Sequence, residues 1–171
     1  TVTDYGFIQI ASLISENRFA VAMLSELSQH VDGVAITEDE VIGLLASKHN
    51  LSFLIKLGSG KLREFEEEQY FSFRDPAVIP IIQCTIPPSS VSKLHLLIAQ
   101  YYEKHNGTIA QIARHYMKTN PDDRSLDAKK ATYLEILAAA QLKGSNLAET
   151  IQTLQTLDEM MNVNPALKSK M

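Results

Sequence analysis

Apolar residues recur every three or four positions through residues 1–50, the spacing that places them on one face of a helix. The sequence predicts three short helices there. Asp4 is placed to cap the first of them. The apolar positions of the first two helices are Phe7, Ile8, Ala11, Ile14, Phe19, Met23, Leu24 and Leu27. Because helices of this length are not stable alone, the three must pack together.

The third helix has the clearest start signal. Thr37 and Glu40 are spaced as a capping box, in which the Thr37 hydroxyl accepts the backbone N–H of residue 40 and the Glu40 carboxylate accepts that of residue 37. Val41, Leu44 and Leu45 supply its apolar stripe. We therefore expect a helix that begins directly after Thr37.

The pattern then changes to that of strands. Residues 51–55 form a short apolar run, and residues 70–73 alternate with aromatic side chains. We expect Gly58-Ser59-Gly60 and the acidic run at Glu64 and 66–68 to form a solvated hairpin loop between the two strands. Three helices followed by a hairpin is the order of a winged-helix module, which we predict for residues 1–75.

Helical spacing returns after Asp75 and continues to the end. Breaks at Asn106-Gly107 and at 144–146 separate amphipathic runs, so each pair of helices should form an antiparallel hairpin. The runs are Leu94, Leu97, Ile98, Tyr101 and Tyr102; Ile109, Ile112, Ala113, Tyr116 and Met117; Ala128, Ala131, Leu134, Leu137, Ala138 and Leu142; and Leu147, Ile151, Leu154 and Leu157. Residues 76–171 are predicted to form a TPR-like solenoid of helical hairpins. The expected fold class is mainly α.

Charge changes the functional picture more than the fold. The chain carries 16 Lys and Arg against 20 Asp and Glu, a net charge of −4, which argues against binding to nucleic acid. The third helix, which would be the recognition helix, begins with Glu38, Asp39 and Glu40. The sequence lacks an apolar run long enough to span a bilayer, so we expect no membrane insertion. The lone Cys84 fits a reducing compartment and is expected to be a small buried hydrophobe.

The candidate chemistry is sparse. Gly58-Ser59-Gly60-Lys61 is the nearest approach to a phosphate-binding loop, but it lacks the first glycine spacing and the Ser or Thr after the lysine. The histidines do not have zinc-site spacing, and His95 and His115 are expected to pack within the helical hairpin. Tyr101, Tyr102, Tyr116 and Tyr133 are expected in the core, with a peptide-binding stripe as the alternative. Since no nucleophile and base can be paired, catalysis, a cofactor and a metal are not expected in this segment.

Four short motifs, taken in order, resemble the segment that follows the ATPase core in signal-transduction NTPases of the STAND/AAA kind. They are residues 7–14 (FIQIASLI), 70–75 (YFSFRD), 93–103 (KLHLLIAQYYE) and 112–116 (IARHY). In that family a winged helix and a TPR-like array carry the matching motifs. The chain departs from the family at Asp75, which replaces a histidine, at Lys93, which alone remains of several basic residues, and at Pro87-Pro88.

The resemblance implies a non-catalytic regulatory and protein-interaction segment of a larger cytoplasmic signalling protein. Such NTPases are fused to class III adenylyl or guanylyl cyclases, kinases or LuxR-type regulators, and the array acts as a scaffold. ATP and magnesium would bind upstream of Thr1, and the non-Met start fits a segment of a longer chain. The partners would be other proteins or other domains of the same chain.

The residues expected at the junction of the two modules, or in interactions, lie on the strand and helices of these motifs. They are Phe71, Phe73, Asp75, Leu94, His95, Tyr102, His115 and Tyr116. The alternative is a DNA-binding winged-helix transcription regulator, which the acidic third helix and the acidic run at 66–68 oppose.

Overall fold

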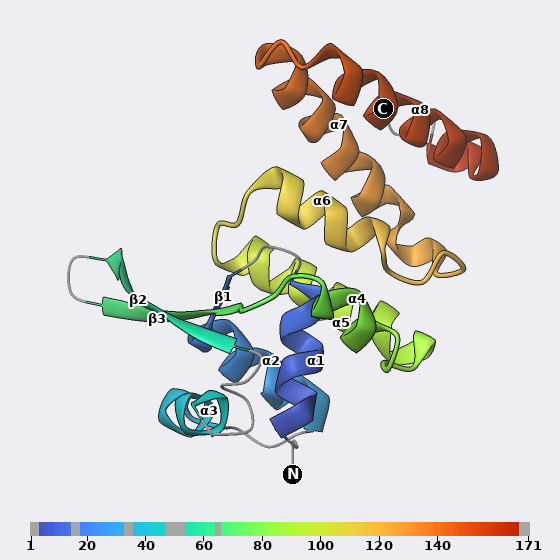
Figure 1. The fold of residues 1–171 in the computed structure, drawn as a ribbon. Helices are drawn as coiled ribbons and strands as arrows, with labels where there is room; N and C mark the ends of the chain where they lie inside the picture. Colours follow the sequence, from blue (N-terminus) through green and yellow to red (C-terminus); the bar gives the residue numbers. More distant parts are fainter. Residues whose placement is uncertain (1–3, 15–17, 33–35, 47–53, 64–65, 168–171) are drawn as a thin grey trace. The chain divides into compact units, whose positions relative to one another are not determined.

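Figure 1 shows the computed structural model, which describes residues 4–14, 18–32, 36–46, 54–63 and 66–167. These residues form mainly helices with one small sheet, so the predicted mainly α class is confirmed. The chain divides into two compact units, Thr1–Leu97 and Ile98–Met171, and the division falls within helix α5 (Pro88–Lys104).

The first unit combines short helices with a three-stranded antiparallel sheet. Its elements are α1 (Asp4–Leu13), β1 (Phe19–Ala20), α2 (Val21–Asp32), α3 (Glu38–Leu45), β2 (Leu54–Arg63), β3 (Glu66–Phe73) and α4 (Val78–Gln83). The sheet has the strand order β1-β3-β2, and helices α1, α2 and α3 pack on one another beside it (Figure 1).

Strand β1 corrects the prediction that Phe19 begins the second helix. Phe19 pairs with Phe71 and Ala20 pairs with Tyr70, and the helix starts only at Val21. Phe19 also fits a helical period with Met23, so its spacing alone does not separate the two states. Pairing with Phe71 decides in favour of the strand, and the buried Phe19 ring packs against Phe73 with ring centroids 5.7 Å apart.

The predicted hairpin loop is too long, because most of the residues assigned to it belong to the two strands. Gly58-Ser59-Gly60 lies inside β2, and Glu66–Phe73 is one continuous strand that includes the acidic run at 66–68. The ladder shifts register between Lys56 and Ser59, which is a bulge of the kind that glycine permits within a strand. The prediction for residues 51–53 and for Glu64 lies outside the described residues.

The start of α3 confirms the predicted capping box. The backbone N of Thr37 donates to a Glu40 carboxylate oxygen at 2.8 Å, and the Glu40 N–H donates to the Thr37 hydroxyl at 3.3 Å. Glu38, Asp39 and Glu40 are exposed at this end, where the helix dipole favours carboxylates. The N–H of Thr37 lowers the pKa of Glu40 from its usual value by stabilising the carboxylate.

Helix α4 belongs to the first unit, so the compact units divide after Leu97 rather than at the predicted residue 75. Two hydrogen bonds tie the α4 region to α1: Gln83 Nε2 donates to the carbonyl of Ser12 at 2.5 Å, and Gln9 Nε2 donates to Thr85 Oγ1 at 3.0 Å. Cys84, predicted to be buried, is exposed, because the turn after α4 directs Ile82 and Ile86 inward instead.

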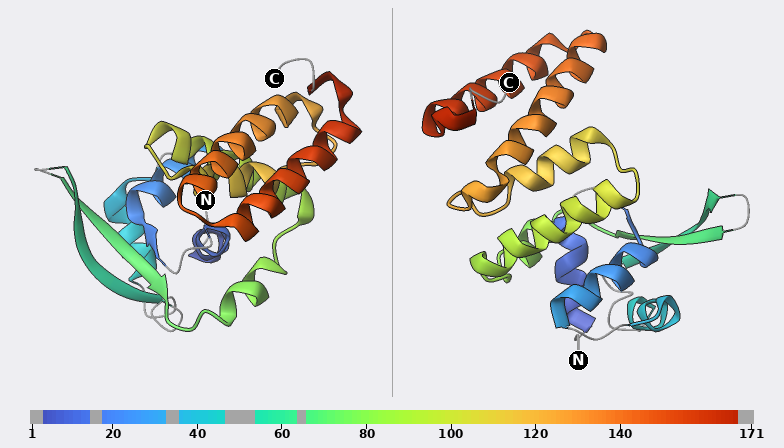
Figure 2. Two further views of the ribbon diagram at one scale, coloured as in Figure 1. Left: turned by 90° about the horizontal axis from the view of Figure 1, so that it is seen from above. Right: turned by 180° about the vertical axis from the view of Figure 1, so that it is seen from behind.

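The second unit is helical. It contains the end of α5 and the elements α6 (Ile109–Met117), η2 (Arg124–Leu126), α7 (Asp127–Lys143), α8 (Leu147–Val163) and η3 (Pro165–Leu167). Helix α6 packs on α7 and α7 packs on α8. Figure 2 shows α7 and α8 side by side, running in opposite directions.

The two turns of this unit lie where the sequence predicts them. Asn106 and Ser145 adopt positive φ angles of 56° and 60°, a conformation typical of tight turns. Gly107 follows Asn106 with its N–H 2.7 Å from the carbonyl of Tyr102, and a Cβ at Gly107 would lie 2.7 Å from the Tyr102 side chain. Thr108 then caps α6 in a capping box with Gln111.

The core of the second unit corrects the predicted face of α8. Leu147, Ile151 and Leu154 are exposed, and the buried side is formed by Thr150, Thr153 and Leu157. The side-chain hydroxyls of both threonines are satisfied by the Asn146 carbonyl and the Gln141 side chain. Leu157 packs with Ala131, Leu134 and Leu167 in the apolar cluster of this hairpin.

Candidate functional site

The structure places the predicted junction residues in two separate groups. In the first unit, Phe71 and Phe73 are buried, and Phe73 contacts Phe19. Asp75 is exposed, and its carboxylate accepts the N–H of Ala77 at 2.9 Å, which shapes the turn before α4. The role of Phe71, Phe73 and Asp75 at a junction of two modules stays a prediction.

The helical members of the predicted set are buried or half-buried. Leu94 and His95 lie on α5 within the first unit and are 7% and 3% exposed. In the second unit, the half-buried Tyr102 faces the buried His115, with ring centroids 5.8 Å apart. Tyr116, one residue further, is fully buried. The structure therefore brings Tyr102, His115 and Tyr116 into one neighbourhood.

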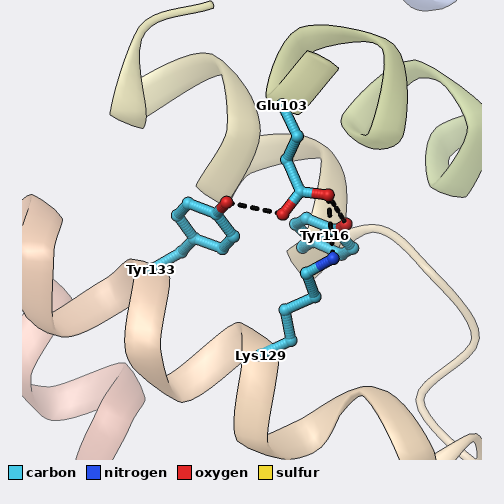
Figure 3. Close-up of polar contacts among 4 residues, drawn as sticks. All are labelled: Glu103, Tyr116, Lys129 and Tyr133. Carbon is cyan, nitrogen blue, oxygen red and sulfur yellow. Dashed lines mark hydrogen bonds and ion pairs between the residues drawn. The ribbon is translucent and has the colours of Figure 1, made fainter. Parts of the chain in front are cut away.

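Glu103 is the centre of a polar network that joins α5, α6 and α7. Its carboxylate accepts hydrogen bonds from the hydroxyls of Tyr116 at 2.6 Å and Tyr133 at 2.5 Å, and it forms an ion pair with Lys129 Nζ at 2.8 Å (Figure 3). The rings of Tyr116 and Tyr133 stack with centroids 5.5 Å apart, and the Lys129 ammonium lies 5.1 Å from the Tyr116 centroid. The Glu103 carboxylate of α5 thus binds side chains from two other helices, α6 and α7.

The pKa shifts in this network follow from its geometry. Burial raises the pKa of Glu103, but the hydrogen bonds from Lys129, Tyr116 and Tyr133 outweigh burial and place it below the usual value. Burial and the bond to Glu103 raise the pKa of Tyr116 to about 12. The same two causes raise the pKa of Tyr133. Burial lowers the pKa of Lys129, but the bond to Glu103 prevails and the pKa lies above its usual value.

These shifts hold every member in the protonation state that suits the network at neutral pH. Glu103 stays ionised as an acceptor, and Tyr116 and Tyr133 stay protonated as donors. A catalytic acid or base needs a pKa near the working pH, and the shifts move these groups away from it. The network is therefore suited to stabilise the packing of the three helices.

Sequence reasoning missed Glu103 although it singled out Tyr116 as a core residue. The partners of Glu103 lie 13, 26 and 30 residues further along the chain, beyond any local pattern. The available signal is an acidic residue at the end of an apolar aromatic run, Tyr101-Tyr102. A carboxylate beside buried aromatic residues needs a hydrogen-bond donor. Tyr116 and Tyr133, two of the four tyrosines expected in the core, donate hydrogen bonds to Glu103.

A pocket of about 280 Å³ lies between the ends of α6, α7 and α8, with Met117, Met160 and Val163 among its lining residues. Two cations line it: Lys130 donates to the carbonyl of Asn120, in the turn after α6, and Arg124 donates to the carbonyl of Val163, the last residue of α8, both at 3.4 Å. Carbonyls at a helix C-terminus favour cations such as Arg124. The volume is near the lower end of the range of about 300–1,000 Å³ usual for ligand pockets.

Helix α8 carries an exposed apolar face. Leu147, Ile151 and Leu154 are 62%, 57% and 48% exposed. Their spacing in α8, i, i+4 and i+7, places the three side chains on one face of the helix. Large contiguous exposed apolar faces mark interaction sites. This face is the candidate functional site of the second unit.

Side chains that could bind a metal ion do not gather at one place among the described residues. Within them, no group of three His, Cys, Asp or Glu side chains is arranged to hold an ion. His105 is exposed and stacks on Tyr101 with centroids 4.2 Å apart. His49 and the side chains of His30 and Lys61 lie outside the described parts of the chain. Over the same described ranges, no helix has both the length and the apolar character needed to cross a bilayer.

Comparison of the chain with models of protein families, with curated proteins and with solved structures gave no match.

Proposed function

We propose that this chain is a non-catalytic regulatory and protein-interaction segment, of the kind that follows the ATPase core in STAND/AAA-type signalling NTPases. The observation that carries the interaction role is the exposed apolar face of Leu147, Ile151 and Leu154 on α8. Leaving three large aliphatic side chains in water costs free energy that a partner surface would recover, about 25 cal/mol per Å² buried.

The element order supports the winged-helix part of the proposal. Strand β1 lies between α1 and α2, the hairpin β2–β3 follows α3, and the sheet order is β1-β3-β2. A winged helix has three helices with a small antiparallel sheet closed by a hairpin, and this arrangement fits it. The hairpin α7–α8, with α6 packed on α7, fits the start of a TPR-like array, in which each hairpin packs on its neighbours.

A winged-helix arrangement also favours the second candidate, a DNA-binding regulator. Electrostatics oppose it, because affinity for DNA depends on Lys and Arg that neutralise phosphates. The exposed first turn of α3 presents Glu38, Asp39 and Glu40, and Arg18, the cation near β1, lies over the Tyr70 ring at 4.9 Å. A mobility-shift assay with duplex DNA at low salt is expected to show no complex. A salt-dependent shift would favour the DNA-binding function.

The absence of catalysis is tested by incubating the full chain with Mg-ATP and measuring phosphate release. We expect no turnover above the buffer blank, for the wild-type chain and for Lys61→Ala alike. Turnover that is abolished by Lys61→Ala would show that the glycine-containing segment of β2 acts on nucleotides, and the non-catalytic proposal would be wrong.

The interaction role is tested with a fluorescein-labelled helical peptide that has leucines on one face and glutamines on the others. We expect it to bind the full chain and to bind Ile151→Ser more weakly. Gln152→Ser is the matched control, since it changes an exposed residue on α8 outside the apolar face. Equal binding to the wild-type chain and to Ile151→Ser, or no binding to either, would remove the support for an interaction role of this face.

A further inference from the structure

The pocket between the ends of α6, α7 and α8 is lined by two cations and two carboxylates. They are Arg124, Lys130, Asp127 and Glu159. Among the residues that the structure describes, no ion pair joins any two of these four side chains. The charges of the pocket therefore do not neutralise one another by direct contact.

Lys130 is the most buried of the four charged residues. It is 5% exposed, and its Nζ donates to the Asn120 carbonyl at 3.4 Å, which is long for a hydrogen bond. An ammonium group has three N–H donors, and the described part of the chain gives Lys130 no second acceptor. A buried charge is costly unless it is paired and hydrogen-bonded. The pocket is therefore suited to an anionic group beside Lys130.

The two carboxylates make a ligand of one charge sign unfavourable. Asp127 accepts from Asn164 Nδ2 at 2.9 Å through one of its oxygens. Glu159 is exposed and accepts no hydrogen bond from a described residue. A purely anionic ligand would face both carboxylates and a purely cationic one would face both cations, and like charges in contact are unfavourable. The lining therefore favours a small molecule that carries both charges.

Apolar side chains form much of the remaining wall of the pocket. They are Met117, Pro121, Met160 and Val163. The volume of about 280 Å³ equals that of about nine water molecules at about 30 Å³ each. A ligand of about nine non-hydrogen atoms with an aliphatic part fits this space, and L-leucine has this size and character.

We propose that this pocket binds a free α-amino acid with an aliphatic side chain. The carboxylate of the amino acid accepts hydrogen bonds from Lys130 and Arg124, and its ammonium group donates to Glu159. Its side chain contacts Met117 and Met160. This site does not use the exposed face of α8, so its test is independent of the proposed interaction role.

Methyl NMR of the full chain, labelled at its methionine methyl groups, measures the binding. The chain has five methionines; Met117 and Met160 line the pocket, and the buried Met23 of the first unit is an internal control. L-Leucine is titrated to about 10 mM, a range that covers the affinity of a ligand with about nine non-hydrogen atoms. We expect saturable shift changes at Met117 and Met160 and none at Met23.

Two analogues of leucine test the two charges of the ligand. Isocaproate has the same side chain and carboxylate but lacks the ammonium group, and isoamylamine keeps the amine but lacks the carboxylate. Each should bind at least about tenfold more weakly than L-leucine, because a charge-assisted hydrogen bond is lost. Glycine, which lacks the aliphatic side chain, should give no saturable shift change.

Two variants locate the binding. Lys130→Met keeps an apolar stem but removes the ammonium group, and should weaken L-leucine by about tenfold or more. Lys143→Met makes the same change in the exposed last turn of α7 and should have no effect. Glu159→Gln should weaken L-leucine but not isocaproate, with Glu149→Gln on α8 as its control. Because Glu159 is exposed, this variant should fold even if Lys130→Met does not.

Weakening of L-leucine by the pocket variants and by neither control would support the proposal. Isocaproate that binds as tightly as L-leucine would overturn the assignment of an amino acid. Binding that is unchanged in Glu159→Gln and in a folded Lys130→Met would show that the ligand lies elsewhere and would overturn the site. The absence of a saturable change at Met117 and Met160 over the whole titration would overturn the pocket as a ligand site.

Discussion

Replacing Glu103 by glutamine should destabilise the packing of α5, α6 and α7. The carboxylate accepts from Tyr116, Tyr133 and Lys129 at 2.6, 2.5 and 2.8 Å. A glutamine side chain has nearly the same shape but one acceptor oxygen instead of two. One tyrosine hydroxyl would then face an NH₂ group that cannot accept its hydrogen bond. The other tyrosine would donate to a neutral oxygen, which is a weaker acceptor than a carboxylate.

The expected loss in the free energy of unfolding is about 2 kcal/mol. A hydrogen bond to a charged group contributes about 1.5–3 kcal/mol, and the Glu103 and Lys129 side chains are 20% and 45% exposed, so their ion pair adds about 0–1 kcal/mol.

Urea denaturation followed by circular dichroism at 222 nm measures this loss, and native-state hydrogen exchange shows whether it is confined to α6 and α7. Glu149→Gln is the matched control, since Glu149 is exposed and its hydrogen bond to Gln141 is long, 3.4 Å. It should change stability by less than about 0.5 kcal/mol. Tyr133→Phe should cost about 1 kcal/mol alone and less when combined with Glu103→Gln, because both remove the same bond.

The reasoning would be refuted if Glu103→Gln unfolded within about 0.5 kcal/mol of the wild-type chain with unchanged exchange in α6 and α7. It would also be refuted if Glu103→Gln and Tyr133→Phe were fully additive, since a shared bond requires coupling between them.

The other predictions concern pH, a close backbone approach and a helix cap. Because the pKa of Glu103 is lowered in the folded chain, its ionised carboxylate stabilises the fold above its ordinary pKa of about 4.3, and this stabilisation is lost as pH falls further. The melting temperature should therefore fall less steeply on acidification for Glu103→Gln than for the wild-type chain. Gly107→Ala should cost about 1–3 kcal/mol in urea denaturation because its Cβ would lie 2.7 Å from Tyr102, whereas Gly43→Ala, with nothing within 4 Å, should be neutral or stabilising by up to about 1 kcal/mol. Thr108→Ala should cost about 1 kcal/mol by thermal denaturation, since it removes the acceptor for the backbone of α6; no loss of stability would show that this capping box is dispensable.

Local sequence chemistry predicted the helix boundaries well. The box at Thr37 and the breaks at Asn106-Gly107 and 144–146 depend on side chains within four residues of the feature they create. The same rule applies to Thr108 and Gln111, whose T-x-x-Q spacing carries the signal for the second capping box. Signals of this range can be read from the chain because nothing distant competes with them.

The errors arose where distant contacts decide between two local states. Phe19 fits a helix by spacing, but pairing with Phe71 makes it a strand residue. Gly58-Ser59-Gly60 has the composition of a turn, but Ser59 and Gly60 pair with β3, so the segment lies within β2 beside a bulge. Periodicity predicted which residues of α8 share a face, yet it did not show that Leu147 and Ile151 face solvent while Thr150 and Thr153 face α7.

The candidate site follows the same division. Tyr116 is predictable as a core residue from its place in an amphipathic helix, and it is fully buried. Glu103 is not, because its role depends on donors from two other helices. The spacing of Leu147, Ile151 and Leu154 predicts that they share one face of α8. Whether that face is buried depends on a neighbouring element, which the spacing does not reveal.

The most direct test is a methyl NMR titration of the full chain with the helical peptide that has leucines on one face. We expect shift changes concentrated at the methyl groups of Leu147, Ile151 and Leu154, which form the exposed face of α8. Shift changes at the pocket residues Met117 and Met160 without changes on this face, or no changes at all, would contradict the claim that this face binds a partner helix.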